Sequence, residues 1–437
     1  MLQAPKGTRD FYPEDMRVQN HLFATWRRAC LAAGFEEYEG PAFEHLELFT
    51  DKSGPEIVTQ LYNFKDKGDR DIALRPEMTP TLARMVNQKG NSLKLPLRWF
   101  SLPRLFRYEK AQKGRLREFF QLNMDIIGCK TVAAEVELLS AIIHMLRAFG
   151  LGEKDFSIRV SSRRLLSDML ERMGVPAEKK PAVYSALDKR AKLGPSEFRN
   201  LLGKVGLTGA DIDRVETFFN FKGIDELTRW VRASGLEDPE ATMKAGNGES
   251  TGLQELEGLF HTIEDIGLGA YLKLDTSIVR GLAYYTGIVF EVYDEGLDMR
   301  AVAGGGRYDN LLANLGGLAL TGVGFGMGDV VLADLLTEKG LMPVGKDQLD
   351  YFLVDVNPAE SKLPAAELVK LAGRLRDKGR RVAYALSGEK FKKQMAQAND
   401  MGASRVLFFG SDKAPAGQYD VKDFKTGEQG VSGFEAL

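Results

Sequence analysis

The sequence predicts an α+β core, in which an antiparallel sheet is flanked by helices, together with a helical insertion and a small C-terminal α/β domain. Three observations predict this fold. Short β-prone runs at residues 72–74, 97–101 and 119–127 lie between two long helices without regular strand–helix alternation. Helical segments dominate residues 175–265, whereas strands and helices alternate regularly from about residue 349. The expected domains are a core of residues 1–170 and 266–340, a helical insertion at 171–265 and a C-terminal domain at 346–437.

The first half of the chain contains the two helices that define the core. Leu22, Trp26 and Cys30 recur at helical spacing, and Gly34 can end the helix predicted over residues 13–34. A second helix is predicted from Thr131, as its N-cap, to Gly150.

The second half begins with the insertion. Helices are predicted there over residues 197–205, 209–220 and 224–234. Strands follow at 288–293 and 300–303, then a glycine-rich turn at 304–309. The C-terminal domain is predicted as a parallel sheet with strands at 351–356, 381–386 and 405–410, and helices at 364–378 and 389–401.

Composition excludes several classes of protein. Charged residues are 27% and hydrophobic residues 44% of the 437, as in ordinary folded proteins. The net charge of −2 provides no global attraction to nucleic acid, so polyanion binding requires local patches. No apolar run is long enough to span a membrane, and the first ten residues lack the apolar core of a signal peptide. Two cysteines and four scattered histidines make neither a disulfide framework nor a zinc site, so we expect a cytosolic protein without a bound metal centre.

The densest basic stretch runs from Arg98 to Arg117 and contains seven cations against one acid, Glu109. Two β-prone runs flank it, and arginines on a strand–loop–strand suit a triphosphate because guanidinium groups bond phosphate oxygens bidentately. The alternative is a solvated charged hairpin. The sequence contains no glycine-rich phosphate loop, so any nucleotide must be held by side-chain cations.

Three further segments are candidates for a ligand site. Arg280 precedes Tyr284 and Tyr285 and an apolar strand, and adjacent strand residues face opposite sides, which places one tyrosine in the core and the other in a pocket. Arg280 could equally cap the strand. Residues 75–79 put an acid and a hydroxyl two residues apart, where they could grip an ammonium group, unless the segment is a surface loop. Residues 304–309 suit either close ligand approach or a plain connector to the next helix.

The order of these segments resembles that in histidyl-tRNA synthetases. The resemblance rests on Lys-Gly-Thr-Arg-Asp at 6–10, Phe-Arg-Tyr-Glu at 106–109 with the basic run to Phe119, Arg-Gly-Leu-Ala-Tyr-Tyr at 280–285, and Gly-Gly-Arg-Tyr-Asp at 305–309. Residues 386–394 and 421–429 resemble that family's anticodon-binding domain.

The resemblance implies a class II aminoacyl-tRNA synthetase. Such an enzyme activates L-histidine with ATP, accompanied by Mg²⁺, and transfers histidine to tRNA(His). The resemblance also implies a homodimer, with the helix ending at Gly34 in its interface, and an insertion that contacts the tRNA acceptor stem.

The resemblance assigns ATP contacts to five residues. It implies that Arg107 and Arg280 are catalytic and hold the α-phosphate from two sides, and that Arg115 reaches the outer phosphates. Phe119 stacks on adenine, and Glu109 bonds the adenine edge.

The histidine contacts are implied in the same way. Glu77, Thr79 and Gln121 match residues that hold the α-ammonium group. Asp125 and Tyr285 match residues that meet the imidazole nitrogens, and Tyr308 would line the same pocket. Tyr284 is also expected among the histidine contacts. Because an imidazole has two polar nitrogens, a partner for each one rejects apolar analogues.

One position departs from the family pattern. The third class II motif ends with an arginine that stacks on adenine, and Val331 stands at that position. Adenine then rests on an apolar floor opposite Phe119, another arginine fills the space, or ATP binding is impaired.

Two other functions compete with the synthetase. A histidine-sensing regulatory subunit of ATP phosphoribosyltransferase keeps the core fold, but typically lacks the tail domain and the Arg280–Tyr285 run. A synthetase for proline, threonine or glycine shares the tail domain but not that run.

Overall fold

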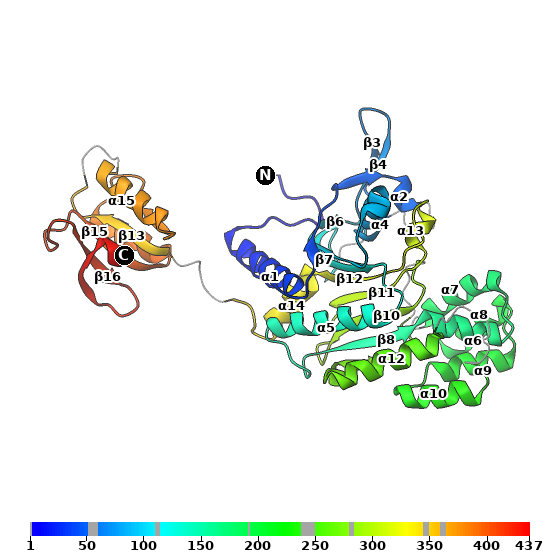
Figure 1. Ribbon diagram of the computed structural model, residues 1–437. Coiled ribbons are helices and arrows are strands. Elements are labelled where there is room, and N and C mark those ends of the chain that lie inside the picture. Colours follow the sequence, from blue (N-terminus) through cyan, green and yellow to red (C-terminus); the bar gives the residue numbers. More distant parts are fainter. Residues whose placement is uncertain are drawn as a thin grey trace. The chain divides into compact units, whose positions relative to one another are not determined.

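The computed structural model describes residues 2–50, 60–109, 114–190, 193–236, 250–278, 284–343, 349–358 and 364–437. The chain forms two compact units, residues 1–342 and 343–437 (Figure 1). No helix within the described ranges is long and apolar enough to cross a membrane.

The first unit is built on a nine-stranded sheet with the order β1-β5-β7-β12-β11-β10-β8-β9, and β6 pairs with β7 off this path. All neighbours run antiparallel except the edge pairs β1–β5 and β8–β9, which are parallel. The strands are β1 (Glu36–Glu37), β5 (Leu97–Ser101), β6 (Arg104–Phe106), β7 (Glu118–Ile127), β8 (Phe156–Ser162), β9 (Leu272–Leu274), β10 (Ile288–Asp294), β11 (Ala303–Arg307) and β12 (Gly322–Gly328). The predicted antiparallel sheet is therefore present, with mixed edges.

The run at 72–74 belongs to a separate three-stranded sheet with the order β2-β4-β3. Its strands are β2 (Phe43–His45), β3 (Asn63–Lys65) and β4 (Asp71–Leu74). The short helix α2 (Glu47–Thr50) follows β2, and α4 (Thr79–Lys89) follows β4 after a four-residue connection.

Helices α1 (Pro13–Ala32) and α5 (Ala133–Ala148) pack against each other. Leu22, Trp26 and Cys30 are fully buried, as the helical spacing predicts. Val132, not the predicted Thr131, is the N-cap of α5, and it makes no side-chain capping hydrogen bond. The remaining helix beside this core is α14 (Asp329–Glu338), and the short α13 (Leu311–Asn314) follows β11.

The described residues between 163 and 265 fold mainly into helices, which are drawn in green in Figure 1. They are α6 (Arg163–Arg172), α7 (Lys180–Asp188), α8 (Pro195–Val205), α9 (Gly209–Phe218), α10 (Ile224–Ala233) and α12 (Gly252–Asp265). Their buried side chains join those of the sheet in one continuous apolar cluster, and α12 packs against α5 and α6.

The second unit is a five-stranded sheet with the order β14-β13-β15-β16-β17. Its elements are β13 (Leu349–Asp355), α15 (Ala366–Asp377), β14 (Val382–Tyr384), α16 (Phe391–Asp400), β15 (Ala403–Phe409), β16 (Gln418–Asp423) and β17 (Gln429–Gly433). The three predicted strands are parallel, as expected, and β16 and β17 add an antiparallel hairpin that the sequence analysis did not predict.

The glycine-rich segment after residue 303 also differs from its prediction. Gly304–Arg307 forms all of β11 after Ala303 and not a turn, and β11 pairs with β10 and β12 on its two sides. A Cβ at Gly305 would lie 2.1 Å from the Gly324 carbonyl oxygen. Glycine is placed in this strand because the neighbouring backbone approaches closely, a reason that β-propensity does not report.

Candidate active site

Two adjoining cavities of about 430 and 500 Å³ lie along the central sheet. Both are lined by Arg107, Glu109, Arg115, Gln121 and Glu291, so they form one continuous cleft. The first cavity adds Arg300, Phe119 and valines to the shared residues, whereas the second adds Glu77, Asn123 and three tyrosines. This division separates two kinds of ligand chemistry within one cleft.

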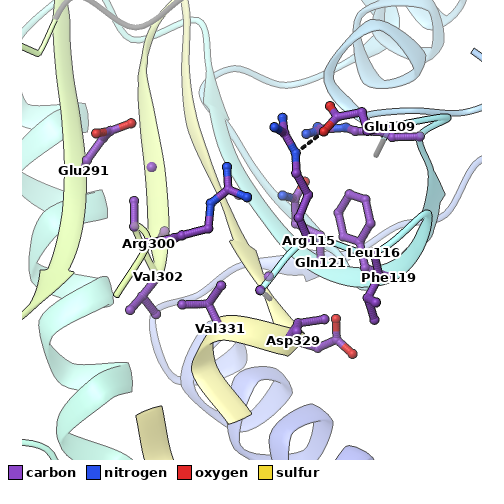
Figure 2. A pocket seen from close by; sticks show the side chains of 18 of the residues that line it. Glu109, Arg115, Leu116, Phe119, Gln121, Glu291, Arg300, Val302, Asp329 and Val331 are labelled. Carbon is purple, nitrogen blue, oxygen red and sulfur yellow. Dashed lines mark ion pairs between the residues drawn. The ribbon is translucent and has the colours of Figure 1, made fainter. Parts of the chain in front are cut away.

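The hairpin of β6 and β7 places the predicted cations in the first cavity. Arg107 lies where β6 ends, its Nε donates to the Pro76 carbonyl over 2.9 Å, and its guanidinium carbon is 5.3 Å from the centroid of the Phe119 ring. Arg115 forms an ion pair with Glu109 (Figure 2). Burial, and then the charges of Arg300 and Arg107, lower the pKa of Arg115. The cavity is thus prepared for an anion that balances this positive charge.

The basic stretch divides between the cleft and the outer surface. Arg98 and Arg104 pair with Glu137 and Glu118. Arg117 lies over the ring of Tyr108. Lys110 and Lys113 lie outside the described residues. A solvated hairpin therefore explains only part of the stretch, since Arg107 and Arg115 line the cleft.

The N-terminal segment supports the same hairpin. The backbone N–H of Arg117 donates to the Gly7 carbonyl over 2.9 Å, and Arg9 forms a 2.7 Å ion pair with the buried Asp329 at the start of α14. The other oxygen of Asp329 accepts from the backbone N–H of Phe120 at 3.0 Å. Residues 6–10 thus link the start of β7 to Asp329, which begins α14 and lines the first cavity.

The second cavity contains a buried acid, Glu77. The preceding Arg75 is 4% exposed and donates to the Glu39 carboxylate and the Gly40 carbonyl, which fixes the segment against the core. Residues 75–79 are therefore not a surface loop. Glu77 Oε2 accepts from the Tyr284 hydroxyl over 2.9 Å, and Thr79 begins α4 beside it.

Tyr284 and Tyr285 both line the second cavity, and Tyr285 is also part of a buried apolar cluster, so the expectation of one core and one pocket tyrosine is confirmed only in part. Strand alternation does not apply to them because β10 begins only at Ile288. Their ring centroids are 5.0 Å apart, and Tyr284 meets Tyr308 edge-on at 6.1 Å. Burial, followed by the charge of Glu77, raises the pKa of Tyr284 well above its ordinary value, so its hydroxyl remains a donor.

Asp125 lies directly behind this wall. Tyr308 and Gly324 line the cavity, whereas Asp125 is not among the described residues that line it. Its Oδ1 accepts from the Tyr308 hydroxyl over 2.6 Å. Burial raises the pKa of Asp125 to about 7, and the hydrogen bond from Tyr308 opposes the rise. A carboxyl group so held can change charge near neutral pH.

The glycines of β12 make room for these side chains. Gly322, Gly324 and Gly326 alternate and so share one face of the strand. A Cβ would lie 2.3 Å from the Tyr308 ring at Gly322, 1.9 Å from Asp125 Oδ1 at Gly324 and 2.6 Å from the Gln121 side chain at Gly326. Glycines at every second position do not fit a nucleotide-binding loop. Here they leave one face of the strand without side chains, and the neighbouring side chains fill that space.

Comparison with protein families matches residues 7–328 to histidyl-tRNA synthetase and residues 342–437 to an anticodon binding domain. The chain belongs to the histidyl-tRNA synthetase family. A histidine–tRNA ligase of Opitutus terrae is 41% identical over 426 residues, which cover 97% of this chain and 94% of that protein. A chloroplastic/mitochondrial histidine–tRNA ligase of Arabidopsis thaliana is 40% identical over 428 residues, covering 98% and 84%. The resemblance drawn from the motifs is confirmed.

Solved structures of the family share the fold. Histidyl-tRNA synthetase from Nostoc sp. matches with a TM-score of 0.80 at 24% identity, covering 100% of this chain and 98% of that one. A Bacillus halodurans protein described as an ATP phosphoribosyltransferase regulatory subunit/histidyl-tRNA synthetase matches at 0.72 and 24% identity, covering 93% and 98%. The predicted class II fold is confirmed.

The cleft brings together most of the predicted site residues. Arg107, Glu109, Arg115, Phe119 and Gln121 line the first cavity, and the second contains Glu77, Thr79, Gln121, Tyr284, Tyr285 and Tyr308. Arg280 lies outside the described residues.

Residues that the sequence reasoning missed also line the cleft: Gln60, Asn123, Glu291 and Arg300. A signal existed for Glu291, because a charge in the middle of the apolar run 288–293 indicates a functional face.

Proposed function

We propose that this chain is a histidine–tRNA ligase, which forms histidyl-adenylate from L-histidine and ATP and then transfers histidine to tRNA(His). The observation that carries the proposal is the cleft itself: a pocket of acids and phenols adjoins a pocket of arginines and an aromatic ring, and Arg107 and Gln121 belong to both. A reaction between an amino acid and a nucleotide needs this juxtaposition of two substrates.

The second cavity suits histidine. Glu77, Thr79 and Gln121 would hold the α-ammonium group, and the buried Glu77 supplies the negative charge. The imidazole would lie among Tyr284, Tyr285 and Tyr308. Because Tyr308 donates to Asp125, the carboxylate orients this phenol, and a modest shift of Tyr308 would give the imidazole access to Asp125.

The first cavity suits ATP. Phe119 would stack on adenine, and the histidine carboxylate oxygen would attack the α-phosphorus while the bond to the bridging oxygen breaks and its electron pair leaves with pyrophosphate. Arg107 would neutralise the α-phosphate, and Arg280 would do so from the other side, as its place in the family motif suggests. Arg115 would meet the outer phosphates. Its ion pair with Glu109 links the proposed phosphate contact to the proposed contact with the adenine edge.

Magnesium would enter with ATP. Mg²⁺ commonly binds one or two carboxylates together with substrate phosphates, whose charge it neutralises, and Glu291 fits this role because it lines both cavities.

The same proposal covers the wider organisation of the chain. Residues 1–170 and 266–340 would be the catalytic core, 171–265 a module for the tRNA acceptor stem and 346–437 the anticodon-binding domain. We also propose a homodimer, since the family's first motif builds an interface, and a cytoplasmic location, where translation takes place.

The test is exchange of labelled pyrophosphate into ATP, run with each standard amino acid separately. Exchange that requires L-histidine supports the proposal. The competing function is a histidine-sensing regulatory subunit of ATP phosphoribosyltransferase, which shares the core fold and is less supported by the curated relatives. A folded protein that binds L-histidine but catalyses no exchange would establish that function instead.

A further inference from the structure

Arg300 lies beside Val331 in the first cavity. Both residues line it, and Figure 2 shows the Arg300 side chain reaching into the space above Val302 and Val331. Gly114 marks the closeness of the two: a Cβ there would lie 3.4 Å from Arg300 Cδ and 3.6 Å from Val331 Cγ2. A cation from the connection between β10 and β11 therefore occupies the neighbourhood in which α14 presents only a valine.

The guanidinium of Arg300 is available for a ligand. It is exposed and forms no ion pair or hydrogen bond with any residue of the described ranges. Arg9 and Arg115, by contrast, have the carboxylates of Asp329 and Glu109. An arginine directed into a concave site without a carboxylate partner is suited to bind something that enters the site.

The surroundings favour an aromatic face. Val302 is 2% and Val331 9% exposed, so the floor beneath Arg300 is apolar, and Phe119 lines the same cavity. A flat purine entering this space would have the Phe119 ring available on one face. A planar guanidinium can cover the other face, since arginine stacks on aromatic rings and carries charge.

We propose that Arg300 closes the base pocket by lying over the adenine ring opposite Phe119, and so supplies the cation that the family motif places at position 331. This inference deepens the proposed function and rests on it, since it concerns the nucleotide of that reaction. In the family motif the cation comes from the helix α14, whereas in this chain it comes from the segment before β11, and both would cover the same face of the adenine.

Four variants test the assignment: Arg300→Ala, Arg300→Lys, the double variant Arg300→Ala/Val331→Arg, and the control Arg70→Ala. Arg70 is an exposed arginine of the same unit that pairs with Asp66 outside the cleft. Calorimetry would measure binding of ATP, of adenosine and of L-histidine to each protein, with thermal unfolding as a check on folding. Adenosine is the decisive probe because it has the base but no phosphate.

We expect Arg300→Ala to weaken the binding of ATP and of adenosine by the same factor. The loss should be about 3- to 30-fold, the size expected for a desolvated cation–π contact. L-histidine binding should be unchanged. The lysine variant should recover only part of the loss, because an ammonium group can make a cation–π contact but cannot stack flat on the base, whereas the double variant should recover most of the loss by returning a guanidinium from α14. Arg70→Ala should match the wild type.

Unchanged adenosine binding alongside weakened ATP binding would place Arg300 on the phosphates and overturn the assignment, as would full recovery by lysine. Unchanged binding of both ligands would also overturn it. These binding results do not depend on catalysis. Failure of histidine-dependent exchange in the wild type would instead refute the proposed function, so the two failures are distinguishable.

Discussion

The substitution Tyr308→Phe removes one hydroxyl from the wall of the second cavity and leaves the ring in place. The lost group is the donor of the 2.6 Å hydrogen bond to Asp125, the interaction that opposes the effect of burial on the Asp125 pKa. A hydrogen bond to a charged group contributes about 1.5–3 kcal/mol, equivalent to about 1–2 pH units of pKa. The pKa of Asp125 should therefore rise from about 7 to about 8–9 in the variant.

Histidine affinity follows from the ionised fraction of Asp125, provided that an imidazole N–H donates to the carboxylate. At pH 7 the ionised fraction falls from about one half in the wild type to about 1–10% in the variant. Binding of L-histidine is therefore weakened about 5- to 50-fold. Because an acid ionises as pH rises, the two proteins converge at higher pH, and near pH 9 the difference shrinks to about twofold or less.

Calorimetric titration of L-histidine from about pH 6 to 9 measures this effect as the ratio of the two Kd values, in which the ionisation of free histidine cancels. The control Tyr351→Phe removes an equally buried hydroxyl, which donates to the Leu437 carbonyl in the second unit, and should change nothing. A ratio that stays constant across the pH range would refute the ionisation argument. A ratio near one throughout would show that the hydrogen bond has no part in histidine binding.

Three further outcomes are expected. Glu77→Gln should weaken L-histidine binding about tenfold or more, through loss of the buried charge, because the amide oxygen can still accept from Tyr284, while the KM for ATP in pyrophosphate exchange stays near its wild-type value; a loss shared equally with ATP would contradict the assignment. Arg280→Ala should lower the kcat of exchange about 10²- to 10³-fold with histidine binding retained, since its charge acts as the phosphorus reacts; parallel loss of histidine binding, measured by calorimetry, would count against it. Deletion of residues 343–437 should reduce tRNA charging and spare most of the exchange, and normal charging by the shortened chain would exclude an anticodon role.

The periodicity of apolar residues predicted those helices and strands whose buried face is visible in the local sequence. The stripe of Leu22, Trp26 and Cys30 located α1, because a helix that covers a core must repeat apolar residues every three to four positions. The same logic failed for Gly304–Arg307, which lacks the side chains that mark a strand. What fixes that strand is the closeness of the Gly324 backbone, and a contact between distant segments has no local signal.

The site was predictable in its residue types but not in its pairings. Arg115 and Glu109 were assigned separate ligand contacts, yet in the structure they neutralise each other. Arg300 had no pattern to single it out, since only the fold places it beside Val331. Asp125 was predicted at the imidazole, whereas its position behind Tyr308 depends on the register of β7 and β12, in which it lies opposite Gly324.

The glycines on one face of β12 determine which positions of the histidine pocket can be changed to alter its specificity. Any side chain added at Gly322, Gly324 or Gly326 would displace a neighbour that already fills the space, so these positions cannot be used to reshape the pocket. Room for a bulkier imidazole, such as one bearing an alkyl group, has to come from trimming the aromatic wall at Tyr285. A variant library for non-natural histidine analogues should therefore randomise that wall and leave the glycine strand intact.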